Sequence, residues 1–291
     1  MKYYVISLLC CILPISVFAE VARLSNYRGW KDCYSIKNEK AEVILCPVAG
    51  GRVLYYAVNG KNIIFEDPGF DGYLLDDFRK DRRWPDGGRF DIGPESIPGK
   101  QRDELFMGEW QVLVQDDYTV ELLYDKENTL GVSVSRKFTL HEKGSQLTMT
   151  QVMTNQTTHP VKRHYWGRVF CKGGGTVILP LDGKGGWGFM GKHSSEHVTE
   201  KKDRLEYTLR NEVTKVGSGS HEGWLAYRVD GLEITQEFLC FPGGDYSDTD
   251  GYTTIFYANG KLCELEPVSP TVLLQPGQSY TFIQKWRLRE M

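Results

Sequence analysis

The sequence predicts an all-β protein, and three observations support this. Most of the chain alternates between apolar and polar residues, or runs apolar, over stretches of strand length with turn residues between them. No stretch keeps a helical period for more than three turns. Asn59-Gly60, between two such stretches, is a strong short-range hairpin signal. Together these patterns indicate a large antiparallel β-sheet protein.

The individual strands can be placed from this alternation. The predicted strands of the first half are, in chain order, 42–47, 52–58, 62–65, 110–114, 119–124, 131–140 and 146–154. Glycine-rich turns then punctuate the chain at 143–145, 173–175, 183–186 and 258–260. The roughly 270 residues that follow the leader fit one large β domain, so we expect a single domain over 20–291.

The N-terminus predicts export. Met1-Lys2 is followed by an apolar run over 3–18 and by Ala19, as in a secretory signal peptide comprising residues 1–19. No second long apolar run follows, so the mature protein is expected to be periplasmic or extracellular, without a membrane anchor. The alternative is a lipoprotein attached through Cys10, which would leave an unusually short apolar stretch before the cysteine.

Composition narrows the classes of partner. The net charge of -3 and the pI near 6.1 argue against nucleic-acid binding, which needs a concentrated basic face. Seven Trp and sixteen Tyr suit sugar stacking, and they suit a large β core equally well. The five cysteines after the signal are scattered without a metal-binding spacing, so buried free thiols are expected, with one disulfide as the alternative.

One long segment, 66–107, does not look like strands. It is rich in Asp, Arg, Gly and Pro, and an unstructured connection of this length inside a compact domain is usually functional. We therefore expect a loop that lines a binding site, with a solvated surface excursion as the alternative. Its candidate substrate-binding residues are Arg82, Trp84, Arg89, Asp91 and Glu95.

Metal sites are only weakly indicated, and the prediction is that no cofactor is needed. His193 and His197 have a spacing that binds zinc on a helix, but the Ser and Gly residues around them disfavour a helix. Closely spaced carboxylates within 245–250 resemble part of a calcium-binding loop, but the bidentate Glu of such a loop is missing. These carboxylates are Asp245, Asp248 and Asp250, and an acidic hairpin tip is the alternative.

Two predicted strands carry residues suited to chemistry. His164, Trp166 and Arg168 alternate, so they should share one face of a strand. An aromatic ring can stack on a pyranose, Arg can donate to hydroxyls, and His titrates near neutral pH. Glu264 and Glu266 likewise share a face of a late strand that precedes the Pro276-Gly277 hairpin.

Together these passages resemble the galactose mutarotase-like superfamily, the aldose 1-epimerases and their relatives. The resemblance rests, in chain order, on Gly50-Gly51-Arg52, Thr154-Asn155-Gln156-Thr157, Pro160-Val161, His164, Leu265-Glu266 and Leu274-Gln275-Pro276-Gly277-Gln278-Ser279-Tyr280. Within the superfamily, the start and the ending are most similar to an uncharacterised family of secreted bacterial proteins. The resemblance implies a large antiparallel β-supersandwich that binds a sugar or oligosaccharide, with Glu266 as the catalytic base and His164 as the acid.

The sequence also departs from the family pattern. Arg163 stands where an Asn usually precedes the catalytic His, Pro267-Val268 replaces a Thr-Gln pair, and the Asp86-Gly87-Gly88 turn lacks the second sugar-facing His. Three functions therefore stay open. They are an exported sugar mutarotase or epimerase; a glycan lyase or glycoside-cleaving enzyme with Glu266 paired to Glu95, Asp91 or Glu237; and a carbohydrate-binding protein without turnover.

Overall fold

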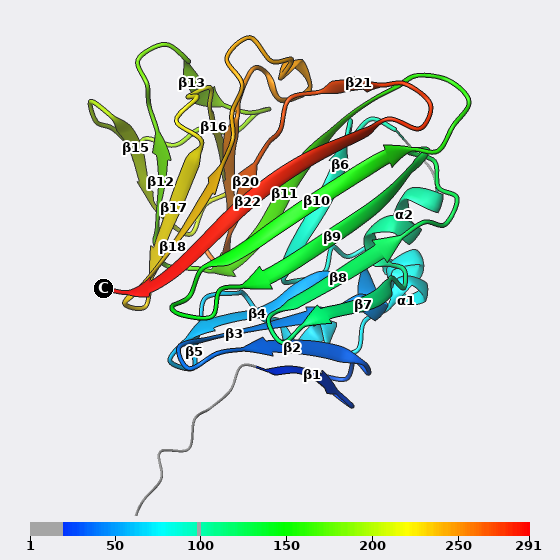
Figure 1. The fold of residues 1–291 in the computed structure, drawn as a ribbon. Coiled ribbons are helices and arrows are strands. Elements are labelled where there is room, and N and C mark those ends of the chain that lie inside the picture. Colours follow the sequence, from blue (N-terminus) through cyan, green and yellow to red (C-terminus); the bar gives the residue numbers. More distant parts are fainter. Residues whose placement is uncertain (1–19, 98–99) are drawn as a thin grey trace, which may run out of the picture.

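The computed structural model describes residues 20–97 and 100–291 and consists of two large antiparallel sheets stacked face to face (Figure 1). This confirms the predicted all-β class. The helices α1 (Leu75–Asp81) and α2 (Lys100–Met107) lie at one edge of the molecule, beside β7 (Gln111–Asp116) and β8 (Thr119–Tyr124) (Figure 1). The predicted signal peptide and Cys10 lie outside the described residues. No described helix is long and apolar enough to cross a membrane.

The first sheet has twelve strands and carries the candidate site. Its order is β1 (Glu20–Leu24), β2 (Cys33–Lys37), β3 (Ala41–Cys46), β4 (Arg52–Val58), β6 (Gly88–Gly93), β11 (Val161–Lys172), β20 (Leu262–Pro267), β19 (Thr254–Ala258), β16 (Thr214–Ser218) and β13 (Trp187–Phe189). The short strands β5 (Lys61–Asn62) and β21 (Val272–Leu274) pair with β4 and β11.

The second sheet has ten strands. Its order is β14 (Val198–Glu200), β15 (Arg204–Thr208), β12 (Thr176–Pro180), β17 (Trp224–Val229), β18 (Leu232–Phe238), β22 (Ser279–Glu290), β10 (Leu147–Asn155), β9 (Val132–Leu140), β8 (Thr119–Tyr124) and β7 (Gln111–Asp116). The predicted strands therefore fall within about a residue or two of observed ones, except that 62–65 is only partly a strand.

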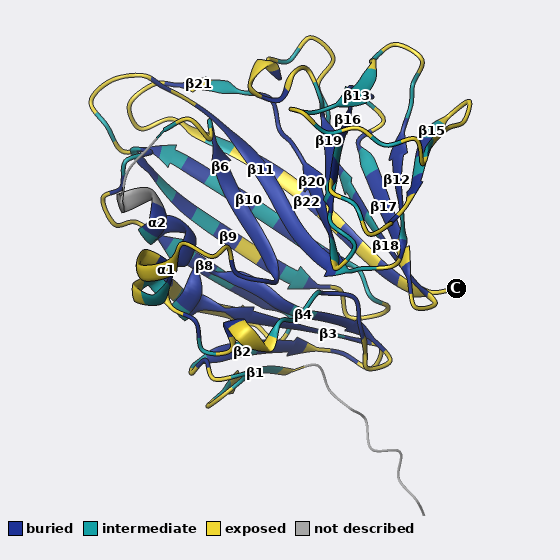
Figure 2. Ribbon diagram, turned by 180° about the vertical axis from the view of Figure 1, so that it is seen from behind, coloured by how far each residue is buried: buried dark blue, intermediate teal, exposed yellow. Residues whose placement is uncertain are grey.

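The core lies between the two sheets. Alternate residues of β11 point into it, and Tyr165 stacks on Phe282 of β22 with ring centroids 5.7 Å apart. The other residues of β11 must then face away from the second sheet. Figure 2 shows that the middle strands β6, β11 and β20 are nevertheless buried along most of their length. The outer face of this sheet is therefore largely covered. The five described cysteines are free thiols.

The hairpin predicted at Asn59-Gly60 joins β4 to β5. Asn59 has φ 50° and Gly60 has φ 76°, so both residues have the left-handed backbone that a tight two-residue turn requires. Pro276-Gly277 likewise turns the chain into β22, with the Gln278 amide donating to the Gln275 carbonyl over 2.9 Å.

The segment 66–107 is not the unstructured loop that its composition suggested. It contains α1 (Leu75–Asp81), β6 in the middle of the first sheet, and α2 (Lys100–Met107). β6 was missed because its polar residues Arg89 and Asp91 looked like loop chemistry. In fact they alternate with Phe90 and Ile92, which are buried in the core. The charged residues on either side of β6 therefore concealed the alternation of a strand whose outer face is polar.

A buried carboxylate anchors the beginning of this segment. Asp86 accepts hydrogen bonds from the Arg28 guanidinium over 2.8 Å and from the Asp67 amide over 2.7 Å. Arg52, which is fully buried, donates to the Asp86 carbonyl over 2.6 Å. These bonds fix the turn between α1 and β6, and with it the position of Trp84.

Candidate functional site

The candidate site is built on the outer face of β6, β11 and β20. In the register of these strands Arg168 lies opposite Arg89, and Phe170 lies opposite Glu264. Directly opposed residues point to the same side of a sheet, so the even-numbered residues of β11 and β20 share this face. His164 and Glu266, the predicted catalytic pair, are therefore on one side of the sheet.

Part of this face opens to solvent as a cleft of about 480 Å³, which we call the open cleft. Its lining residues are Trp84, Arg89, Glu95, Arg168, Phe170, His193, Lys215, Tyr257, Asn259, Leu262 and Glu264. It therefore combines three aromatic rings with cations, carboxylates and an amide. Such a mixture of apolar surface and hydrogen-bonding groups is typical of a small-molecule site.

Two arginines on the floor of the open cleft are held by carboxylates. Arg89 Nε donates to Asp91 over 3.0 Å, and Arg168 lies 3.3 Å from the other oxygen of Asp91. Arg168 also donates to the exposed Glu95 over 2.8 Å. The Trp84 ring lies 4.4 Å from the Arg89 guanidinium carbon. Arg89 Nη1 is buried and has no hydrogen-bond partner among the described residues.

Glu264 is the carboxylate at the floor of the open cleft, and it is 8% exposed. Burial raises the pKa of its carboxyl from 4.5 to about 7, and the like charge of Glu266 adds to the rise. Nearby cations oppose this, with Arg89 Nη2 at 3.9 Å from Glu264 Oε1. Within the described part of the chain, Glu264 Oε1 has no hydrogen-bond partner. A carboxyl that titrates near neutral pH in a cleft is suited to accepting and returning a proton.

Glu266 lies deeper, with no exposed surface. Its Oε2 accepts a hydrogen bond from the indole of Trp166 over 2.7 Å and lies 3.4 Å from Lys215 Nζ. Two cations also contact the Trp166 ring, with the Arg168 guanidinium carbon 4.5 Å and Lys215 Nζ 5.2 Å from its centroid. Trp166 is therefore a fixed part of the wall beside Glu266.

His164 is on the same face and is 1% exposed. Its Nε2 lies 3.5 Å from Asp248, and its Nδ1 lies 3.4 Å from the hydroxyl of Thr271. Opposite it stands Gly93, where a Cβ atom would lie 2.0 Å from the imidazole, so only glycine fits there. The rings of His164 and Trp166 are 5.9 Å apart.

We call His164, Trp166 and Glu266 the covered cluster. Its indole touches both other members, by the hydrogen bond to Glu266 and by the ring contact with His164. The indole packs in a small apolar group with Tyr246, Ile255 and Val268, and Met190 and Tyr252 pack against this group. The covered cluster therefore adjoins the open cleft but does not line it.

The structure thus brings together only some of the predicted site residues. Those that line the open cleft are Trp84, Arg89, Glu95 and Arg168. Asp91 lies behind the two arginines, and Arg82 lies elsewhere, paired with Asp103. Lys215, Tyr257 and the position of His193 in the open cleft were missed. The available signal was strand alternation, since Lys215 in β16 and Tyr257 in β19 each stand between two buried residues. In the structure the two residues lie opposite each other.

The weak metal hypotheses gain no support from the geometry. Among the described residues, no group of three or more His, Cys, Asp or Glu side chains is placed to hold a metal ion. Asp245 accepts hydrogen bonds from the amide and hydroxyl of Ser247, and Asp248 contacts His164. His193 lies beside Tyr257, with ring centroids 6.3 Å apart.

Comparison with known proteins adds evidence on the fold. No protein-family model and no curated protein sequence matches this chain. Among solved structures, a protein from Escherichia coli K12 named as a candidate aldose 1-epimerase is 14% identical, with a TM-score of 0.63, and the match covers 89% of this chain and 99% of that one. A galactose mutarotase-like protein from Lactobacillus casei is 12% identical over 88% of this chain and 100% of that one, with a TM-score of 0.60.

A galactose mutarotase-like protein from Clostridium acetobutylicum is 13% identical, with a TM-score of 0.57, and the match covers 89% of this chain and 95% of that one. The chain has the galactose mutarotase-like fold. The resemblance seen in the short sequence motifs is thereby confirmed at the level of fold. At these identities the likeness carries over the architecture and not the reaction.

Proposed function

We propose that this galactose mutarotase-like protein binds a sugar in the open cleft and interconverts its anomers, as an aldose 1-epimerase does. The observation that carries the proposal is the Glu264 carboxyl, which sits on the cleft floor with its pKa raised to about 7. The rings of Trp84, Phe170 and Tyr257 supply apolar surface for the faces of a pyranose. The fold, shared with mutarotase-like proteins, supports the same class of reaction.

The chemistry requires one base and one acid. Glu264 takes the proton from the C1 hydroxyl while the bond from C1 to the ring oxygen breaks, and an acid protonates that ring oxygen. The open-chain aldehyde then rotates about the C1–C2 bond, and reclosure on the other face returns both protons. His193 lines the same cleft, and its ring nitrogens can donate and accept a proton, so we assign it the acid role.

The pair implied by the sequence resemblance, Glu266 and His164, stays a prediction. In the described geometry a sugar reaches neither residue unless Trp166 and its apolar cover move. We therefore give Glu266 a positioning role, since its negative charge adds to the raised pKa of Glu264. Variants of Glu264 and His193 on one side, and of Glu266 and His164 on the other, distinguish which pair carries out the reaction.

A second candidate function is glycoside cleavage. A specific observation favours it, because the open cleft holds two carboxylates, Glu264 and Glu95. Glycoside hydrolysis uses such a pair as acid and base or nucleophile. The other partners considered from the sequence are less suited, since Asp91 is bound by both arginines and Glu237 lies on the second sheet.

The test is NMR spectroscopy of freshly dissolved α-glucose and α-galactose. We expect the parent protein to speed anomerisation, and Glu264→Gln to lose roughly 10²- to 10⁴-fold of that enhancement. His193→Asn should lose less, because water can replace the acid. Equal rates with the parent and with Glu264→Gln would contradict the proposal. A digest of neutral oligosaccharides by the parent, abolished by Glu95→Gln, would establish cleavage instead, and tight binding without either activity would establish a binding protein.

We also propose that the protein is exported after removal of residues 1–19. The support is the short charged start and the apolar run that the sequence places before Ala19. N-terminal sequencing of the protein from a periplasmic fraction should begin at Glu20. A lipid-modified Cys10 or Cys11, detected by mass spectrometry, would contradict this.

A further inference from the structure

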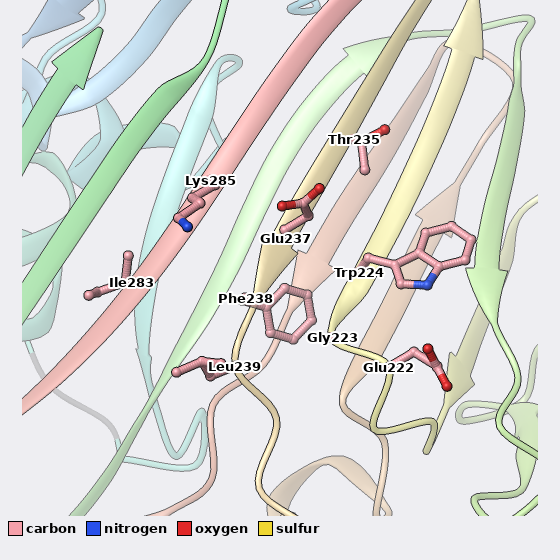
Figure 3. A pocket seen from close by; sticks show the side chains of 9 residues that line it. All are labelled: Glu222, Gly223, Trp224, Thr235, Glu237, Phe238, Leu239, Ile283 and Lys285. Atoms are coloured by element: carbon pink, nitrogen blue, oxygen red, sulfur yellow. The ribbon is translucent and has the colours of Figure 1, made fainter. Parts of the chain in front are cut away.

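A second cavity, of about 470 Å³, lies on the outer face of the second sheet (Figure 3). Its lining residues are Glu222, Gly223, Trp224, Thr235, Glu237, Phe238, Leu239, Ile283 and Lys285. Neighbouring residues of these strands, such as Leu225 and Phe282, point into the core. This cavity therefore faces away from the first sheet, on the opposite side of the sandwich from the open cleft. We call it the outer groove.

Three side chains cross the outer groove in register. Trp224 of β17 lies opposite Glu237 of β18, which lies opposite Lys285 of β22. The same order is visible in Figure 3, where Glu237 stands between the indole and the lysine. Direct cross-strand neighbours have Cβ atoms about 5 Å apart, so an aromatic face, a carboxylate and an ammonium group are presented within the span of one or two sugar rings.

The rest of the outer groove supplies apolar surface and polar groups near its ends. Leu239 is 67% exposed and Ile283 is 40% exposed, which is a high exposed fraction for large aliphatic side chains on a surface that faces solvent. Glu222 is exposed at the end nearest Trp224, and Thr235 offers a hydroxyl. A ligand that covered these residues would bury apolar surface and meet several hydrogen-bonding groups.

The charges of the outer groove are balanced. Glu222 and Glu237 are opposed by Lys285 and by Arg287, which pairs with Glu237. An anionic or a cationic ligand would therefore gain little, whereas an uncharged, hydroxyl-rich ligand matches both the acceptors and the donors. The indole suits the flat face of a pyranose, which presents C–H groups.

From these observations we propose that the outer groove binds a neutral glycan, with one pyranose stacked on Trp224 and its hydroxyls bonded to Glu237 and Lys285. This site is independent of the proposed reaction in the open cleft. It would keep the protein on a polymer while the open cleft acts on a separate sugar unit.

The test is native electrophoresis through gels that contain hydroxyethylcellulose, xylan, glucomannan or galactomannan. We expect at least one of these polymers to retard the parent protein. Trp224→Ala should weaken the retardation at least tenfold, and Trp224→Phe should keep part of it, since a smaller ring still stacks. Leu113→Ala, which shortens an exposed apolar side chain of β7 outside both cavities, is the matched control and should be retarded like the parent. Trp84→Ala reports whether the polymer binds in the open cleft instead. Lys285→Ala, an exposed substitution that should not affect folding, should weaken binding several-fold.

Each contrary result overturns the proposal. These results are the absence of retardation by all four polymers, equal retardation of Trp224→Ala and the parent, and loss of retardation in Trp84→Ala with Trp224→Ala unaffected. Light scattering provides a further check. A dimeric parent and a monomeric Trp224→Ala, neither retarded by a glycan, would show that the outer groove is a contact between copies of the chain. Near-ultraviolet circular dichroism should confirm that Trp224→Ala is folded, and Lys285→Ala carries the test if it is not.

Discussion

The open cleft and the covered cluster lie on the same face of the same sheet, yet they differ in what can reach them. Glu264 and Glu266 are two residues apart on β20, and both point to this face. Glu264 borders a cavity of about 480 Å³, whereas Glu266 has no exposed surface. The difference comes from Trp166 and the apolar group packed against it, not from the strand that carries the two carboxylates.

This contrast teaches that strand alternation determines the face of a residue but not its access to solvent. The cover is made by residues from distant parts of the chain, such as Tyr246 and Val268. Access of a substrate to a carboxylate then determines what that carboxylate can do. A carboxylate that a substrate cannot contact can act only by shifting the pKa of a neighbour that the substrate does contact. Each of the following substitutions tests whether the two regions differ as the geometry indicates.

The largest expected effect on stability comes from opening the covered cluster. Trp166→Ala should lower the free energy of unfolding by about 3 to 5 kcal/mol, because it leaves a cavity and removes the donor to buried Glu266. Urea denaturation measures this. Trp84→Ala is the matched control, since its ring is 49% exposed and its loss should cost only about 1 kcal/mol. Equal costs for the two variants would mean that the covered cluster is not packed as described.

Sequence reasoning reached the shared face but not the cover. Alternation predicted that His164, Trp166 and Arg168 share one face of their strand. It predicted the same for Glu264 and Glu266, and the structure has both sets on the outer face of the first sheet. Alternation could not show that Trp166 bonds to Glu266 and fills the space beside it, because that contact joins residues 100 positions apart. For the same reason Trp166 was expected to stack on substrate, and Glu266, not Glu264, was expected to be the base.

The fold itself was more predictable than the site. Alternation and turn residues placed β4 and β8 with their observed bounds, because both strands have one face in the core. β6 was missed since its outer face carries Arg89 and Asp91, which bind each other, and Asp91 also contacts Arg168. Strands with a polar outer face can be recognised only when the strands that pair with them in the sheet are known.

A second prediction concerns the pH dependence of stability. The pKa of Glu264 rises from 4.5 to about 7 on folding, so the folded state holds its proton more tightly than the unfolded chain does. The parent should therefore lose stability as the pH rises from about 4.5 to 7. Glu264→Gln should remove this loss and be more stable than the parent at pH 8, by on the order of 1 to 3 kcal/mol.

Thermal unfolding of both proteins at pH 5 and pH 8 checks this prediction. The gain of Glu264→Gln should be larger at pH 8, where the parent carboxylate is charged. Glu95→Gln, which removes an exposed carboxylate of the same cleft, should show no such pH-dependent gain. A gain that is the same at both pH values would show that Glu264 is not the titrating group.

The coupling between the two regions is tested by Glu266→Gln. This change keeps an oxygen for the Trp166 indole and removes the negative charge that helps to raise the pKa of Glu264. If Glu264 is the base, the acidic limb of the rate of anomerisation lies near pH 7 in the parent. In Glu266→Gln it should move to lower pH, by about one unit. An abolished rate at every pH would instead make Glu266 the base itself.

The smallest effect is expected at the far end of the covered cluster. Asp248 lies 3.5 Å from His164 and is itself partly exposed, so Asp248→Asn should change the free energy of unfolding by at most about 1 kcal/mol. The rate of anomerisation should stay within about twofold of the parent, because neither residue lines the open cleft. A loss of 10²-fold or more in both Asp248→Asn and His164→Asn, with Glu264→Gln active, would move the reaction centre into the covered cluster. Substrate entry would then require Trp166 to swing away from Glu266, and quenching of tryptophan fluorescence on adding sugar would report that motion.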